Sequence, residues 1–170
     1  MTHMFAAKQT IFISFCLTLA VMALCQYCVQ PPDYPDEPVI EFKNLSKAMM
    51  IQSALGVDSV VITFTYTDGD GDLGFEDNTA SLYIEDGRDS FAKPPYRIPF
   101  VGTQGAGNGV SGEISIVVPT PCCIFNNVAC NTTTFVPQFD TLFYRIRIQD
   151  RAGHTSNTIQ TDPIQLRCRQ

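Results

Sequence analysis

The alternation of apolar and polar residues along the chain predicts β-strands over most of its length after residue 38. Residues 60–67 carry large apolar side chains at the even positions and mainly threonine at the odd ones. This period of two fits a strand with one buried face and fits no helix. The same alternation recurs at residues 40–42, 82–84, 114–118, 142–148 and 164–166.

The segments between these predicted strands are rich in Gly, Pro, Asn and Asp, and no amphipathic helix of any length interrupts them. We therefore predict an all-β domain over residues 39–170, an antiparallel β-sandwich of about seven strands. Residues 47–55 are ambiguous in this respect. We interpret them as extended or irregular rather than as a turn of helix.

A run of glycines before residue 113 has the spacing of a phosphate-binding loop. Gly107, Gly109 and Gly112 form a G-x-G-x-x-G pattern. A phosphate-binding loop opens a helix, whereas this one leads into the predicted strand at 113–118. We therefore interpret the run as a hairpin loop rather than as a nucleotide site.

The amino-terminal segment has the pattern of a secretory signal. An apolar run of 14 residues, at positions 11–24, follows a short segment that contains Lys8 and no acidic residue. A membrane-spanning helix needs roughly 20 apolar residues, so this run favours a signal over a permanent anchor. We predict a signal peptide at 1–27, a tether rich in Pro and acidic residues at 28–38, and the sandwich after it.

Two ways of processing this segment are open. In the first, Cys28 is the lipidated residue of a bacterial lipoprotein, although Tyr27 stands where the lipid signal normally has a small residue. In the second, cleavage after Ala23 releases a soluble chain that keeps Cys25 and Cys28.

The composition argues against a nucleic-acid-binding protein and against an enzyme. The chain has 17 acidic and 11 basic residues, a net charge of −6, and it lacks the basic surface that a nucleic-acid-binding protein needs. His154 is the only histidine after the signal, and no G-x-S-x-G motif occurs. These features favour a non-catalytic protein over an enzyme.

Four cysteines follow the tether, which are Cys122, Cys123, Cys130 and Cys168. An even set in an exported protein predicts two disulfides. Adjacent cysteines are poorly placed to bridge each other, so Cys122 and Cys123 are each expected to pair with Cys130 or Cys168. A zinc site is disfavoured because the set lacks a C-x-x-C pair.

A dense acidic turn follows the strand at 60–67. Residues 68–77 contain five carboxylates, at Asp68, Asp70, Asp72, Glu76 and Asp77. In an extended chain the first three would lie about 6.6 Å apart in succession, too far to share one ion. The interleaved Gly69 and Gly71 allow backbone angles that curl the segment until the three carboxylates converge.

Calcium is the cation that best accepts such a set of oxygens. The turn is not an EF-hand loop, because Leu73 and Thr79 stand at the positions that require Gly and Glu. Asp150, in the turn after the strand at 142–148, is predicted to reach the same ion from a neighbouring loop. Alternatively, Asp150 only caps its own turn.

Four motifs together resemble small exported lipoproteins of Bacteroidota. They are C-x-x-P-P-x-Y-P-x-x-P-x-I-x-F at 28–42, D-S-V-x-I-T-F-x-Y-T-D-G-D-G-D-L-G at 58–74, the pair at 122–123, and D-R-A-G-x-x-S-N-T at 150–158. The resemblance covers nearly the whole chain after the signal. It implies an immunoglobulin-like or cadherin-like sandwich, a lipid anchor at Cys28, and a place in the cell envelope, at the outer membrane or exposed on the surface.

We therefore expect a non-catalytic, calcium-stabilised surface module that is tethered to a lipid membrane and serves in adhesion, in envelope structure or as an accessory to a larger complex. The alternative is a secreted, soluble module that binds a glycan or a protein ligand. Trp is absent, so the rings available for stacking on a sugar are Tyr83, Tyr96, Phe91 and Phe100. The sequence does not identify the partner in either case.

Overall fold

The computed structural model describes residues 33–53, 55–102, 109–125, 128–129 and 139–168. The predicted signal peptide, residues 28–32 of the predicted tether, which include Cys28, and Cys130 lie outside these residues. Within them every regular element is a strand, which confirms the all-β class. No helix in this part of the chain is long and apolar enough to cross a membrane.

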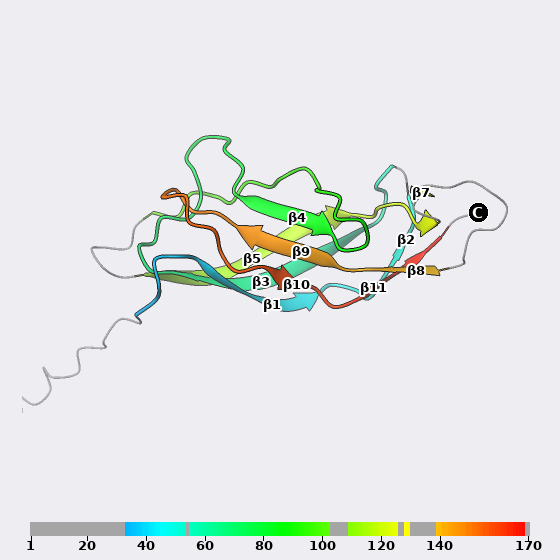
Figure 1. Ribbon diagram of the computed structural model, residues 1–170, viewed down its shortest axis with the longest axis horizontal. Coiled ribbons are helices and arrows are strands. Elements are labelled where there is room, and N and C mark those ends of the chain that lie inside the picture. The colour runs from blue at the N-terminus through cyan, green and yellow to red at the C-terminus, as the bar shows by residue number, and fades with distance from the viewer. Residues whose placement is uncertain (1–32, 54, 103–108, 126–127, 130–138, 169–170) are drawn as a thin grey trace, which may run out of the picture. The chain divides into compact units, whose positions relative to one another are not determined.

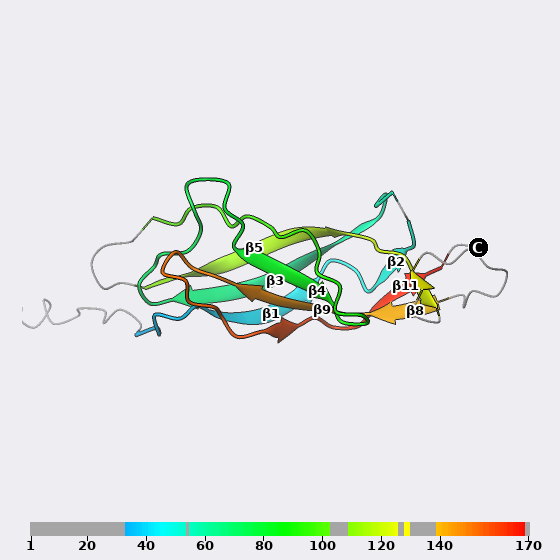
Figure 2. The ribbon, with the colours of Figure 1, turned by 45° about the horizontal axis from the view of Figure 1, so that its top comes forward.

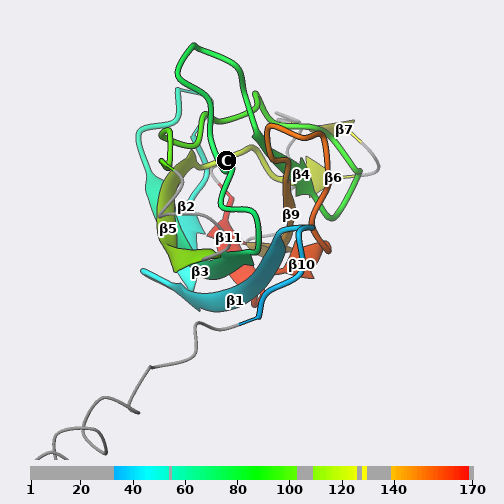
Figure 3. The same cartoon turned by 90° about the vertical axis from the view of Figure 1, so that its left-hand side faces the viewer.

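The strands are β1 (Val39–Leu45), β2 (Met49–Ile51), β3 (Ser59–Asp68), β4 (Leu82–Asp86), β5 (Val110–Pro119), β6 (Ile124–Phe125), β7 (Val128–Ala129), β8 (Phe139–Leu142), β9 (Tyr144–Ile148), β10 (Ile159–Gln160) and β11 (Ile164–Arg167). They form three-stranded sheets in the orders β1-β3-β5, β10-β9-β4 and β2-β11-β8, and a hairpin of β6 and β7 (Figure 1). Viewed along the strands, the first two sheets face each other across the core (Figure 3).

The strands are more numerous than predicted because long ones are interrupted. Phe143 alone separates β8 from β9, and residues 161–163 separate β10 from β11. Pairing continues across this break, since Tyr144 N donates to Thr161 Oγ1 and Thr161 N donates to the Tyr144 carbonyl. Pro163 lacks an N–H for the ladder. The consecutive strands β8 and β9 are therefore one long strand that passes from one sheet to another, and the same is true of β10 and β11.

Strand β2 is the exception to the antiparallel pattern, because it pairs with β11 in parallel. It lies inside residues 47–55 and confirms their interpretation as extended at 49–51. Strands β1 and β2 follow each other in the chain, so the first part of the domain contributes β1 to the β1-β3-β5 sheet and β2 to the sheet of β11. The prediction of a purely antiparallel sandwich is wrong at this one pair.

Burial follows the predicted alternation. In β3 the side chains of Val60, Ile62 and Phe64 are fully buried, while their odd-numbered neighbours are partly exposed. Ile146 and Ile148 of β9 approach them from the opposite sheet as parts of the same core. Each such side chain contributes about 1.5–3 kcal/mol when it is fully buried, so these faces fix how the sheets pack.

One disulfide of the structure joins Cys123 to Cys168, which is one of the predicted pairings. Cys123, just before β6, is bonded to Cys168 at the end of β11, with their Cα atoms 5.9 Å apart. Cys122 is also disulfide-bonded. The adjacent cysteines therefore do not bridge each other.

Residues 103–108 of the glycine run lie outside the described residues, but the strands on either side of the run do not form a hairpin with each other. Strand β5 begins at Val110, directly after Gly109, and pairs with β3 along its whole length. The preceding strand, β4, belongs to the other sheet. The connection therefore crosses between two sheets, and the hairpin interpretation is wrong, although the absence of a helix after the run agrees with the exclusion of a nucleotide loop.

Candidate metal centre

Two turns from different sheets meet at one end of the sandwich. The acidic turn begins where β3 ends at Asp68, and the second turn follows the end of β9 at Ile148. Both lie at the left in Figure 1 and remain together in the turned view (Figure 2). The ends of two facing strands thus bring their polar turns to one place.

Four carboxylates converge there. One oxygen from each of Asp68, Asp70, Asp72 and Asp150 lies within 4.8 Å of the others. The first three come from the acidic turn and the fourth from the turn after β9. The structure brings together the predicted ligand set, which could hold a metal ion.

The two glycines of the acidic turn have different roles. Gly71 has a φ of +68°, as the predicted curl requires. Gly69 does not have a positive φ. Instead it lies against the tether, where a Cβ would be only 2.3 Å from the Tyr34 carbonyl oxygen, and its N–H donates to the Pro35 carbonyl at 2.8 Å. The prediction that Gly69 curls the turn through unusual backbone angles is therefore wrong. Glycine is required at this position because the tether backbone packs too closely for a side chain.

Two of the four carboxylates are deeply buried. Asp68 is 0% exposed and Asp150 is 1% exposed, whereas Asp70 is exposed. Asp68 Oδ2 accepts a hydrogen bond from Asp72 N at 2.9 Å. The other oxygen, Oδ1, is buried and has no hydrogen-bond partner, and the same is true of Asp72 Oδ1. Unpaired buried carboxylate oxygens are costly, and a bound cation could satisfy both of them.

The electrostatics agree with this reading. Burial, together with the nearby charge of Asp70, raises the pKa of Asp68 to about 7. Among the described residues, no Lys or Arg forms an ion pair with any of the four carboxylates, and His154 is the one ionisable partner. In the described part of the chain, His154 is therefore the one side chain that can offset the repulsion within the group.

Asp150 caps its own turn and also lies within the acidic group. Its oxygens accept hydrogen bonds from His154 N at 2.7 Å and from His154 Nδ1 at 3.0 Å, so it caps its own turn. The same carboxylate lies in the acidic group. The hydrogen bonds orient it, and its contact with His154 raises the pKa of the imidazole.

Arg151 fastens the two turns together, a role that the sequence analysis missed. Its Nη1 donates to the carbonyls of Leu73 at 2.9 Å and Gly74 at 2.8 Å, and its guanidinium lies 4.6 Å from the centre of the Phe100 ring. The positive charge is therefore directed to backbone carbonyls and an aromatic ring rather than to the carboxylates. Its position next to Asp150 was the only signal in the sequence.

The last two acids of the turn do not join the group. Asp77 Oδ1 accepts a hydrogen bond from Thr79 N within its own bend, and Glu76 is outside the four residues that converge. The acidic residues of this segment therefore differ in role, because Asp77 stabilises a local bend while the first three carboxylates converge. Only the part interleaved with glycine forms the candidate site, whose all-carboxylate oxygens suit a hard cation.

The four aromatic residues considered for sugar stacking do not form an open platform. Arg147 lies over the ring of Tyr83 at 4.5 Å, Lys93 lies over Phe91 at 6.0 Å, and Arg151 covers Phe100. The hydroxyl of Tyr96 donates to the Val117 carbonyl. Three of the four rings therefore have a cation on one face.

Comparison of the chain with family models, with curated proteins and with solved structures found no match. The functional reading therefore depends on the site itself.

Proposed function

We propose that the protein is a non-catalytic, calcium-stabilised module of the cell envelope. The observation that carries the proposal is the convergence of Asp68, Asp70, Asp72 and Asp150, with two buried oxygens unpaired. Calcium accepts six to eight oxygens in flexible geometry, whereas magnesium keeps much of its water and prefers one or two carboxylates. The ion has a structural role in this proposal, because it joins the turns of two sheets.

An immunoglobulin-like topology is part of the proposal. The orders β1-β3-β5 and β4-β9-β10 correspond to three strands from each sheet of that fold, A-B-E and C-F-G. The pairing of β2 with β11 supports this topology, because the first two strands of the domain then belong to different sides of the sandwich.

Location in the envelope rests on the sequence and on the disulfides. The Cys123–Cys168 bond is typical of a protein that folds in an oxidising compartment. With the apolar run at 11–24, this supports export, and we propose attachment to a lipid membrane through Cys28. The protein would then act in adhesion, in envelope structure or as an accessory to a larger complex.

Thermal unfolding of the purified, oxidised protein in calcium and in chelator tests the ion. At 100 times its dissociation constant, a ligand stabilises the folded state by about 2.7 kcal/mol, which should raise the melting temperature by several degrees. The double variant Asp70→Asn, Asp72→Asn should lose this difference.

Asp77→Asn is the matched control, because Asp77 belongs to the same turn but lies outside the group. It should keep the full response to calcium. Coincident melting curves of the unmodified protein in calcium and in chelator would exclude the proposed site.

A further inference from the structure

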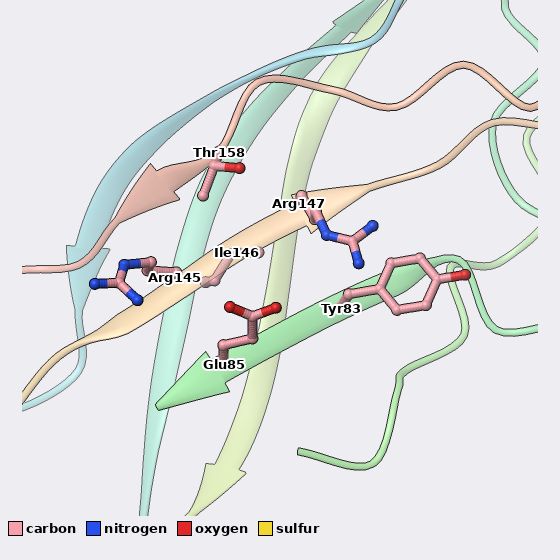
Figure 4. A pocket seen from close by; sticks show the side chains of 6 residues that line it. All are labelled: Tyr83, Glu85, Arg145, Ile146, Arg147 and Thr158. Atoms are coloured by element: carbon pink, nitrogen blue, oxygen red, sulfur yellow. The ribbon is translucent and has the colours of Figure 1, made fainter. Parts of the chain in front are cut away.

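A second polar site lies on the outer face of the β4-β9-β10 sheet, on strand positions distinct from the acidic group. A small pocket of about 160 Å³ is lined by Tyr83, Glu85, Arg145, Ile146, Arg147 and Thr158 (Figure 4). Register places Tyr83 directly opposite Arg147 and Glu85 directly opposite Arg145. Since Ile84 and Ile146 point into the core, these four side chains share the outer face.

Aromatic rings hold both guanidinium groups. Arg147 lies 4.5 Å from the centre of the Tyr83 ring, and the Tyr83 hydroxyl donates to the carbonyl of Ala80 and to Gln149 Oε1, each at 3.4 Å. Arg145 lies 5.3 Å from the centre of the Phe143 ring. Stacking of this kind restricts a guanidinium before any ligand arrives, which reduces the entropy lost on binding.

The donors of these guanidiniums are available. Within the described part of the chain, the guanidinium groups of Arg145 and Arg147 form no hydrogen bond and no ion pair, and each contacts only its aromatic ring. Glu85 likewise has no ion pair there, although it faces Arg145 across the strands. Figure 4 shows its carboxylate between the two arginines, with the Thr158 hydroxyl on the far side of β9.

This combination selects among anionic ligands. A carboxylate matches the planar fork of a guanidinium, which donates two parallel hydrogen bonds to it. A polyanion is disfavoured, because Glu85 occupies the middle of the pocket and the chain carries a net charge of −6. The pocket instead suits a ligand with one negative group and several hydroxyls, which donate to Glu85 and exchange hydrogen bonds with Thr158.

We propose that this pocket binds an acidic saccharide, with the sugar carboxylate on Arg145 or Arg147 and a sugar hydroxyl on Glu85. The pocket volume suits a single sugar unit rather than a long chain. The ring of Tyr83 positions Arg147 and does not stack on the sugar. The site is independent of the acidic group and of the proposed calcium ion.

Nuclear magnetic resonance titration of the whole protein with methyl β-D-glucuronide tests this site. Amide signals of β4 and β9, including those of Tyr83 and Arg147, should shift with a dissociation constant in the millimolar range. Methyl β-D-glucoside lacks the carboxylate, and acetate lacks the hydroxyls, so each should bind about tenfold more weakly. Equal binding of acetate or inorganic phosphate would overturn the proposal in favour of a general anion patch.

Variants locate the binding. Arg147→Ala and Arg145→Ala should each weaken binding of the glucuronide about tenfold, and Arg147→Lys should fall between, because it keeps the charge and loses the fork. Arg167→Ala is the matched control, since Arg167 is an exposed arginine on a strand outside the pocket. Unchanged binding in both alanine variants, with unchanged melting temperatures, would exclude the pocket.

A carboxylate could also bind through calcium at the acidic group, and one variant separates the two sites. The double variant Asp70→Asn, Asp72→Asn should bind the glucuronide as well as the unmodified protein does. Loss of binding there would place the ligand on the ion and overturn the pocket. Failure of the glucuronide titration leaves the melting test of calcium unaffected, because the two experiments measure different sites.

Discussion

The sandwich buries carboxylates at both of its ends, and within the described residues only one end pairs them with an arginine. Strands β4 and β9 are antiparallel, with Leu82 opposite Ile148 and Asp86 opposite Tyr144. Asp86, at the end of β4, is therefore at the far end from Asp150. Asp86 is 2% exposed and Asp150 is 1% exposed, so the two are buried to a similar degree.

At the far end an arginine neutralises the charge. Arg88 donates to both oxygens of Asp86, and its Nη1 donates to Asp140 of β8. Burial acts to raise the pKa of Asp86, but the hydrogen bonds and charge of Arg88 outweigh it and hold that pKa below its usual value. The pKa of Asp68 is raised instead.

The difference shows which carboxylates the fold itself satisfies. Arg88 also donates to the Cys122 carbonyl, so the paired end is joined to the disulfide region by groups of the chain. At the acidic turn the nearby Arg151 binds carbonyls, and among the described residues no Lys or Arg pairs with the carboxylates, where His154 contacts Asp150 alone. This asymmetry supports the proposal that an external ion binds at the acidic turn.

The largest expected effect is that of Arg88→Met. It leaves the buried Asp86 and the partly exposed Asp140 without their cation, and loss of one partner of a buried pair costs about 3–5 kcal/mol. The loss should be the same in calcium and in chelator. Urea unfolding in both conditions measures it, and a loss that depends on calcium would break the comparison between the two ends.

The pH dependence of the metal-free protein should follow Asp68. Its folded pKa of about 7 lies above the ordinary 3.8, so between these values the folded state holds a proton that the unfolded state has released. In chelator, stability should therefore fall as pH rises from about 4 to 7, by up to about 1.4 kcal/mol per pH unit. Asp86 contributes in the opposite sense, because its depressed pKa gives stability that is lost only as the pH falls below the ordinary value.

Urea unfolding in chelator at several pH values between 5 and 7 checks this dependence, with Asp68→Asn as the control that lacks the titrating group. The difference between the two proteins should change steadily with pH. Parallel curves would show that Asp68 does not titrate in this range.

Asp68→Asn should change sign with the ion. In chelator near neutral pH it removes an uncompensated buried charge and should stabilise the protein by about 1–3 kcal/mol. In saturating calcium it removes a ligand and should destabilise it. Melting temperatures in the two conditions measure both effects, and destabilisation in both would mean that Asp68 has a partner other than a cation.

The sequence predicted the features that local pattern controls. The buried face of β3, with Ile62 and Phe64, follows from a period of two within eight residues. The convergence of Asp70 and Asp72 follows from the glycine between them, whose positive φ is a local property. Inclusion of Asp150 needed only the inference that two strand ends lie side by side.

The sequence did not predict features that depend on which distant segments meet. Arg88 and Asp140 are 52 residues apart and pair because β4 ends near β8. Gly69 is required by the tether backbone beside it, and Arg151 binds carbonyls of another loop, so the local sequence does not reveal either contact. At the break between β10 and β11, Tyr144 N bonds to the side chain of Thr161 instead of a backbone carbonyl, which is again a contact between distant segments.

The smallest expected effect concerns a third carboxylate, which is paired but exposed. Glu113 of β5 forms an ion pair with Lys43 of β1, and their side chains are 50% and 45% exposed. Water screens such a pair, so Glu113→Gln should change stability by less than about 0.5 kcal/mol, with or without calcium. Urea unfolding under the conditions used for Arg88→Met measures it. A loss of several kcal/mol would show that an exposed ion pair stabilises this protein as strongly as a buried one, and burial would then not explain the large effect expected for Arg88→Met.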